Sequence, residues 1–207
     1  VDIGADLVRQ EIAADGKPVV LYGLSAGGML AYHIAAETRQ VAGIMGMCFI
    51  DAASSVARRR MSARPGFDEM AFKLLPLIPD SVSGRTRVPM KLLVKMKALV
   101  NDPRALKLLL KDSCSAGASV SLQFVGSMIK YQPAIPFEAF DLCPILLLQP
   151  EKDWWTPFSV TEPFWERVKA PKEIVKLSNA GHYPVEQPGL DQMRDAMAGF
   201  IRALSSP

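Results

Sequence analysis

Short, mostly apolar segments alternate with helix-length amphipathic segments along this chain. The apolar runs at residues 18–22, 41–50, 145–149 and 173–177 predict strands, and residues 1–15, 26–38, 157–168 and 188–204 predict helices. Strands with apolar side chains on both faces are typical of a parallel sheet that helices cover on both sides. The sequence therefore predicts an α/β fold with a mostly parallel sheet.

One long segment interrupts this alternation. Residues 54–141 predict helices, for example after Asp102-Pro103, where a capping aspartate and a first-turn proline precede a helix over 105–111. We expect residues 1–53 and 142–207 to form the α/β core and residues 54–141 to form a helical cap inserted into it.

Positive charge is concentrated in the predicted cap. Residues 54–140 contain 14 Lys and Arg against 6 Asp and Glu, although the net charge of the whole chain is only +3. Lysine is interleaved with apolar residues over 91–97, which favours a helix with one solvated lysine face; the second interpretation is a weak contact with an anionic membrane or lipid. We expect no nucleic-acid partner.

Composition excludes several classes of protein. Of 207 residues, 49% are hydrophobic and 22% charged, which excludes a disordered chain, and no apolar run approaches the ~20 residues of a membrane span. Cys48, Cys114 and Cys143 have no C-x-x-C spacing, so we expect buried, reduced thiols and no disulfide framework, metal or cofactor. Residues 1–15 predict a helix instead of a charged leader, and we expect a cytoplasmic protein.

The first predicted strand runs directly into Gly23-Leu24-Ser25-Ala26-Gly27, and a predicted helix follows. A serine at such a corner adopts a strained backbone conformation that exposes its hydroxyl above the sheet, at the positive end of the helix. We expect Gly23 and Gly27 to be steric requirements, because the strand and helix backbones pass too closely there for a Cβ atom. Ser25 is therefore the candidate nucleophile.

A serine nucleophile requires a general base. His33 lies inside the helix that follows Ser25, about two turns further on, and cannot reach the hydroxyl. His182 lies in a turn-rich loop after the strand that ends at Leu177, at the carboxyl end of a parallel strand, where open α/β sheets place their chemistry. His182 is the candidate base.

The base in turn requires a carboxylate that orients it, and three carboxylates are candidates. Asp153, which is favoured, follows the strand 145–149 in the loop before a helix. Asp51 ends the strand after the nucleophile helix, a position from which a carboxylate can also reach an imidazole, and Glu151 lies close to Asp153 in the chain. With Asp153 the chain order is serine, aspartate, histidine, which is neither the chymotrypsin nor the subtilisin order.

Three motifs, in this order, resemble the α/β-hydrolase superfamily and specifically its capped esterase, lipase and lysophospholipase-like members. They are Gly23-Leu24-Ser25-Ala26-Gly27-Gly28, Lys152-Asp153-Trp154-Trp155-Thr156-Pro157 and Gly181-His182-Tyr183-Pro184. The resemblance covers about residues 3–53 and 142–204. It implies Ser25 as nucleophile, Asp153 as acid, His182 as base and the backbone N–H of Ala26 as one oxyanion donor.

We therefore expect a serine hydrolase that cleaves carboxylic esters through a Ser-His-Asp triad and an acyl-enzyme. Trp154, beside Trp155, and Leu24 are candidate substrate-binding residues. An apolar group on the small-molecule substrate is indicated by the Leu, Met and Phe residues of the cap, including Met61, Phe67, Met70, Phe72, Leu74 and Leu75.

Two alternative functions stay open. The first alternative is a related acyl, peptide or carbon–carbon bond hydrolase, because a triad fixes the chemistry at the carbonyl and not the leaving group. The second alternative is a non-catalytic binding module or an incomplete fragment, because a fold does not establish a function.

The resemblance also implies strands that precede the nucleophile strand, so that the fold predicted here is a partial α/β-hydrolase fold. Those strands and their crossovers need upward of ~60 residues, more than residues 1–17 provide. Residues 19–22 would then form an apolar, unpaired sheet edge. We expect a longer protein or another chain to complete the sheet and to supply the second oxyanion donor.

Overall fold

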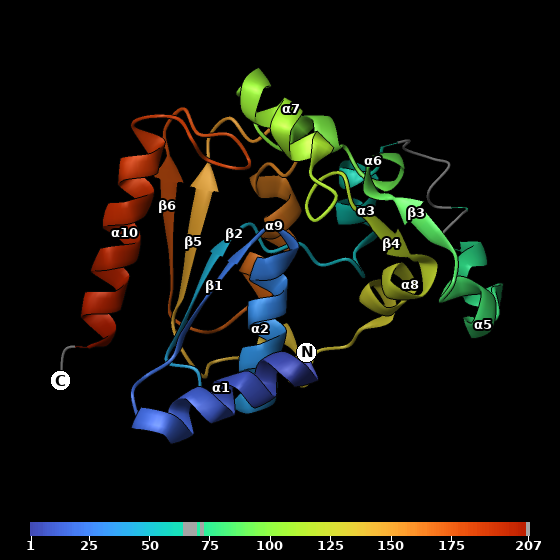
Figure 1. Ribbon diagram of the computed structural model, residues 1–207. Coiled ribbons are helices and arrows are strands. Elements are labelled where there is room, and N and C mark those ends of the chain that lie inside the picture. The colour runs from blue at the N-terminus through green and yellow to red at the C-terminus, as the bar shows by residue number, and fades with distance from the viewer. Residues whose placement is uncertain (64–69, 71–72, 206–207) are drawn as a thin grey trace.

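The computed structural model describes residues 1–63, 70 and 73–205. A parallel sheet with the strand order β1-β2-β5-β6 forms its centre (Figure 1). The strands are β1 (Val20–Leu24), β2 (Gly43–Met47), β5 (Ile145–Pro150) and β6 (Lys172–Leu177). The parallel sheet predicted from the alternation is therefore present, and each predicted strand is found close to its expected position.

Helices cover both faces of this sheet (Figure 1). One face packs against α2 (Ala26–Thr38) and α9 (Phe158–Arg167), with α1 (Asp2–Asp15) against α2, and the other packs against α10 (Gly189–Leu204). Neighbouring strand residues point to opposite faces: Ile145 and Leu147 join the first core cluster, and Leu146 and Leu148 join the second. The strands are apolar throughout because both of their faces are buried.

β1 forms one end of the sheet. Its register with β2 places Val20 opposite Gly43 and Leu24 opposite Met47. Within the described ranges, no strand pairs with the other side of β1, and Tyr22 at its centre is 42% exposed. The unpaired edge expected from the sequence is therefore found.

The segment between β2 and β5 is not wholly helical. Its described helices are α3 (Ser55–Met61), α5 (Asp80–Ser83), α6 (Met90–Leu93), α7 (Pro103–Lys111) and α8 (Leu122–Lys130), with 3-10 turns at 75–77, 96–98 and 137–139. A small antiparallel sheet joins β3 (Arg87–Pro89) and β4 (Ser119–Ser121). The prediction of an entirely helical cap is wrong on this point, because strands of three residues are too short to show a hydrophobic period.

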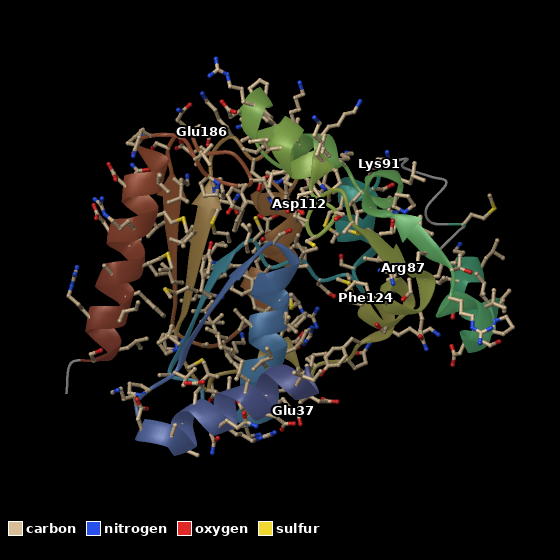
Figure 2. All side chains as sticks on the ribbon, viewed as in Figure 1. Glu37, Arg87, Lys91, Asp112, Phe124 and Glu186 are labelled. Carbon is tan, nitrogen blue, oxygen red and sulfur yellow. The ribbon has the colours of Figure 1, made fainter. Side chains whose placement is uncertain are left out.

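Two local predictions for residues 54–141 have different outcomes. α7 begins as predicted: the Asp102 side chain accepts a hydrogen bond from the backbone N–H of Ala105, and a proline occupies the first turn. The helix predicted over 91–97 is wrong, because α6 ends at Leu93 and the extended residue Val94 bridges to Ser62. The side chain of Lys91 projects into solvent from this region (Figure 2).

Two further predictions concern the burial of the cysteines and the absence of a membrane span. Cys48 and Cys143 are buried free thiols as predicted, whereas Cys114 is free but exposed, in a turn after α7. No helix in the described part of the chain combines the length and the apolar character needed to cross a membrane.

Candidate active site

Ser25 lies at the sharp corner between β1 and α2. Its backbone has φ 59° and ψ −122°, a conformation that residues other than glycine rarely adopt. The backbone N–H of Ser25 donates to the carbonyl oxygen of Met47 at 2.7 Å, which ties the corner to β2. The strained turn predicted from the sequence is therefore present, and it places Ser25 directly before the first turn of α2, at the positive end of the helix.

Close backbone approach explains two of the surrounding glycines. A Cβ atom on Gly23 would lie 2.0 Å from the carbonyl oxygen of Gly27, and one on Gly28 would lie 2.3 Å from the carbonyl oxygen of Cys48. A Cβ atom on Gly27 would meet nothing within 4 Å. The prediction that Gly27 is a steric requirement is therefore wrong. Gly28 carries that requirement instead, because it packs on the chain after β2 whereas Gly27 faces a cavity.

Asp153 and His182 form a buried pair. They follow β5 and β6, and because these strands are parallel neighbours their carboxyl ends meet at one edge of the sheet. Nδ1 of His182 lies 2.8 Å from Oδ2 of Asp153, and both side chains are fully buried. An ionised carboxylate can only accept, so this contact holds the proton of a neutral imidazole on Nδ1 and leaves a lone pair on Nε2. Nε2 itself has no hydrogen-bond partner among the described residues.

The loop after β5 keeps the Asp153 carboxylate ionised. Burial raises the pKa of this carboxyl, but hydrogen bonds and charge from His182, with the hydroxyl and amide of Thr156, outweigh burial and hold the pKa below its usual value. Oδ1 of Asp153 accepts the backbone N–H groups of Trp155 at 2.9 Å and Thr156 at 2.7 Å. The carboxylate is therefore fixed by its own loop before it meets the imidazole.

The other candidate acids and the second histidine lie elsewhere. Asp51 accepts a hydrogen bond from the backbone N–H of Ala53 at 2.9 Å and lines a different cavity, and Glu151 is exposed. His33, in α2, packs edge-on against Tyr131, and burial lowers its pKa to about 4. Of the three candidate carboxylates, Asp153 is the one that contacts His182.

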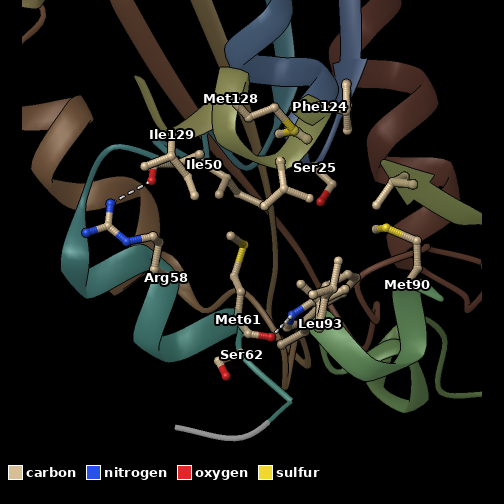
Figure 3. Close-up of a pocket in the computed structure, with 16 residues that line it drawn as sticks. Ser25, Ile50, Arg58, Met61, Ser62, Met90, Leu93, Phe124, Met128 and Ile129 are labelled. Carbon is tan, nitrogen blue, oxygen red and sulfur yellow. Dashed lines mark hydrogen bonds between the residues drawn. The ribbon is translucent and has the colours of Figure 1, made fainter. Parts of the chain in front are cut away.

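An apolar cavity of about 180 Å³ lies beside Ser25 (Figure 3). The Ser25 side chain reaches this space from one side, and Met61 and Leu93 face it from the other. Trp155 connects the cavity to the Asp153–His182 pair. Its ring centroid lies 4.8 Å from that of His182, and its Nε1–H donates to the carbonyl oxygen of Met61 at 3.2 Å. The imidazole therefore packs against an indole ring that lines the same cavity as the serine.

The residues predicted to bind substrate are distributed differently. Trp155 lines the cavity, whereas Trp154 is 71% exposed and Leu24 packs against the core cluster beneath α10. Among the apolar residues named in the predicted cap, Met61 lines the cavity and Leu75 lines a separate one. Met70 and Leu74 are exposed, and Phe67 and Phe72 lie outside the described residues.

Much of the wall comes from α8, which the sequence analysis did not single out. Its contribution is Phe124, Val125, Met128 and Ile129. These residues recur at helical spacing, so an apolar stripe was visible in the sequence, but the partner of that stripe was not.

Cys48 extends the Asp153–His182 pair into a buried cluster. The potential ligand atoms of Cys48, Asp153 and His182 lie within 4.8 Å of one another. Burial, followed by the charge of Asp153, raises the pKa of the Cys48 thiol well above its usual value, whereas metal binding requires a thiolate. The donor set therefore favours internal hydrogen bonding over metal ligation.

Comparisons with known proteins concern the family and the fold of this chain. The sequence matches the Alpha/beta hydrolase family over residues 1–194. A comparison with curated proteins gives no match. Among solved structures, a monoacylglycerol lipase from Paleococcus ferrophilus superposes with a TM-score of 0.70 at 20% identity, over 97% of this chain and 74% of that one.

Two further structures show the same likeness. A soluble variant of monoglyceride lipase from Saccharomyces cerevisiae has a TM-score of 0.65 at 15% identity, over 95% of this chain and 68% of that one. Human thioesterase 2 has a TM-score of 0.56 at 13% identity, over 100% of this chain and 84% of that one. At these identities the likeness concerns the fold alone. The family match, together with the parallel sheet and the strained serine corner, identifies this chain as a member of the alpha/beta hydrolase family.

Proposed function

We propose that this hydrolase cleaves carboxylic esters with Ser25 as nucleophile, His182 as base and Asp153 as acid. One observation carries the proposal: the Asp153–His182 pair leaves Nε2 without a partner, and the ring of Trp155 links this pair to the cavity that Ser25 lines. The strained backbone at Ser25 supports it further, since such strain is concentrated at functional sites.

The reaction follows from these roles. Ser25 Oγ attacks the ester carbonyl while Nε2 of His182 takes the hydroxyl proton, and the Ala26 N–H at the start of α2 stabilises the oxyanion. Collapse of the tetrahedral intermediate breaks the bond to the alcohol, which leaves with the proton from His182. Water, deprotonated by His182, then attacks the acyl carbon, the bond to Ser25 Oγ breaks, the proton passes from His182 to Oγ, and the carboxylic acid leaves. Asp153 stabilises the imidazolium in both halves of the reaction.

The cavity supports an apolar acyl group of about six to eight carbons. Its volume of about 180 Å³ is slightly larger than the ~150 Å³ apolar cavity that accommodates benzene. Its wall is mainly aliphatic, aromatic and methionine side chains, which favour an alkyl chain over a polar group. The two lipases among the similar structures support an ester as the substrate.

Turnover of p-nitrophenyl hexanoate tests the proposal. We expect Ser25→Ala to abolish turnover without changing the unfolding temperature, and Asp153→Asn to lower kcat by about 10⁴-fold. Asp51→Asn is the matched control and should keep near-native activity. A severe loss in Asp51→Asn with a mild one in Asp153→Asn would refute the acid assignment, and no turnover by the native chain would favour a binding module.

A further inference from the structure

The hydroxyl of Thr156 lies at the centre of the buried cluster. Its Oγ1 lies 2.7 Å from Oδ2 of Asp153, 2.8 Å from Nδ1 of His182 and 3.0 Å from Sγ of Cys48. Thr156, His182 and Cys48 are each 0% exposed, and Asp153 is 4% exposed. Each polar hydrogen in the cluster must therefore find its acceptor inside the cluster, since water does not reach it.

The donors and acceptors fix the direction of these hydrogen bonds. Oδ2 of the ionised Asp153 can only accept, so the Thr156 hydroxyl and the Nδ1–H of His182 both point toward it. The Thr156 oxygen then has lone pairs left for the Cys48 thiol, whose S–H is closer to this oxygen than to Oδ2, at 3.0 Å against 3.5 Å. The bonds run from Cys48 through Thr156 to Asp153.

We propose that Thr156 is a positioning residue for the His182 base and that Cys48 supports it. This inference rests on the proposed function. The hydroxyl shares Oδ2 with the imidazole, so it stabilises the negative charge and fixes the oxygen that orients the ring. Without it, Oδ2 becomes more basic, and the imidazolium beside it gives up its proton less readily.

The other titratable groups near the pair do not obscure the expected change in the titration of His182. Among the described residues, Cys48, directly after β2, contacts the pair, and Tyr22 of β1 interacts with Cys48 and with Tyr183. Burial raises the pKa of both the thiol and the phenol above their usual values. Neither group therefore loses its proton in the range where an ester hydrolase is assayed.

The pH dependence of kcat/KM for p-nitrophenyl hexanoate tests the inference. We expect Thr156→Val to lower kcat/KM about 10-fold and to move its acid limb to higher pH by about 0.5 to 1 unit. Thr156→Ser keeps the hydroxyl and should keep the native acid limb. Thr161→Val is the matched control, because Thr161 is also 0% exposed and accepts the Phe49 N–H at 3.0 Å, but lies outside the cluster.

A second readout does not depend on turnover. The chain has two histidines, so His33→Gln assigns the His182 imidazole signal, which is then titrated by NMR. We expect Thr156→Val to raise the midpoint and Thr156→Ser to leave it unchanged; equal midpoints in the two variants would overturn the inference. If the native chain does not hydrolyse the ester, the proposed function fails while this titration still decides the role of Thr156.

The thiol gives an independent pair of variants if Thr156→Val does not fold. Cys48→Ala removes the donor to Thr156, and Cys48→Ser keeps one. We expect an upward shift of the His182 midpoint in Cys48→Ala, smaller than that in Thr156→Val, and a near-native midpoint in Cys48→Ser. Identical midpoints in both would contradict the supporting role of Cys48.

Discussion

The cavity beside Ser25 sets a measurable preference for acyl chain length. Each methylene transferred from water to an apolar wall contributes about 0.8 kcal/mol, or roughly fourfold in kcat/KM when the contact is kept in the transition state. Four methylenes separate an acetyl from a hexanoyl group, so kcat/KM should rise by up to about 200-fold between them. The gain should stop near eight carbons, where a cavity of about 180 Å³ is filled.

A larger side chain in the wall should move this optimum. Leu93 faces the cavity from α6 (Figure 3), so Leu93→Phe reduces the space for the acyl chain. Overpacking of this kind costs about 1–3 kcal/mol, so we expect octanoyl esters to lose about 10-fold in kcat/KM while acetyl esters are unaffected. Leu77→Phe is the matched control, because Leu77 is 76% exposed and does not line the cavity.

Initial rates on p-nitrophenyl esters from acetate to dodecanoate, with the native chain and both variants, supply the measurement. Two results would refute the reasoning. The first is a kcat/KM that falls steadily from acetyl upward in the native chain. The second is the same chain-length profile in Leu93→Phe and Leu77→Phe.

Three further predictions concern the framework of the site. Gly28→Ala should lower the free energy of unfolding by about 2–4 kcal/mol, because its Cβ would lie 2.3 Å from a carbonyl oxygen. Gly27→Ala should lower the same free energy by less than about 1 kcal/mol, and urea titration of both variants measures the difference. Glu186, in the loop that carries His182 (Figure 2), accepts hydrogen bonds from the backbone N–H groups of Gly181 at 3.1 Å and Val185 at 3.2 Å. Glu186→Ala should therefore lower kcat about 10-fold, and Glu186→Gln, which keeps an acceptor, should lower kcat much less. The pKa of Asp153 is lowered in the folded state, so its stabilising contribution is fully present above the unfolded pKa of about 3.9 and is lost as pH falls through the lower folded pKa. The unfolding free energies of the native chain and Asp153→Asn should therefore converge below about pH 4, and a constant difference would refute this.

The elements of the sheet and its flanking helices were predictable because local chemistry determines them. The helix over residues 26–38 is found with these bounds, since the elbow glycines begin it and the loss of apolar spacing ends it. β5 was equally clear, since its side chains are buried on both faces. The antiparallel pair β3–β4 was not predictable, because three residues carry no period and their pairing depends on a partner about 30 residues away.

The candidate site also has a part that was predictable from the sequence and a part that was not. Ser25, Asp153 and His182 follow strands, so their common edge of the sheet could be inferred from chain order alone. The contacts of Thr156 and Cys48 with Asp153 could not be inferred, because Cys48 follows a different strand, β2, and its thiol resembles any core residue. Gly27 was misjudged for a similar reason: which of two adjacent glycines meets a carbonyl depends on how α2 packs on the chain after β2.

Covalent labelling by a fluorophosphonate tests the central claim most directly. The reagent captures an activated serine without any assumption about the leaving group, and mass spectrometry locates the adduct. We expect one adduct per chain, on Ser25, which is absent in Ser25→Ala and much slower in Asp153→Asn. An unlabelled folded protein, or an adduct on Ser62, which also lines the cavity, would contradict the account.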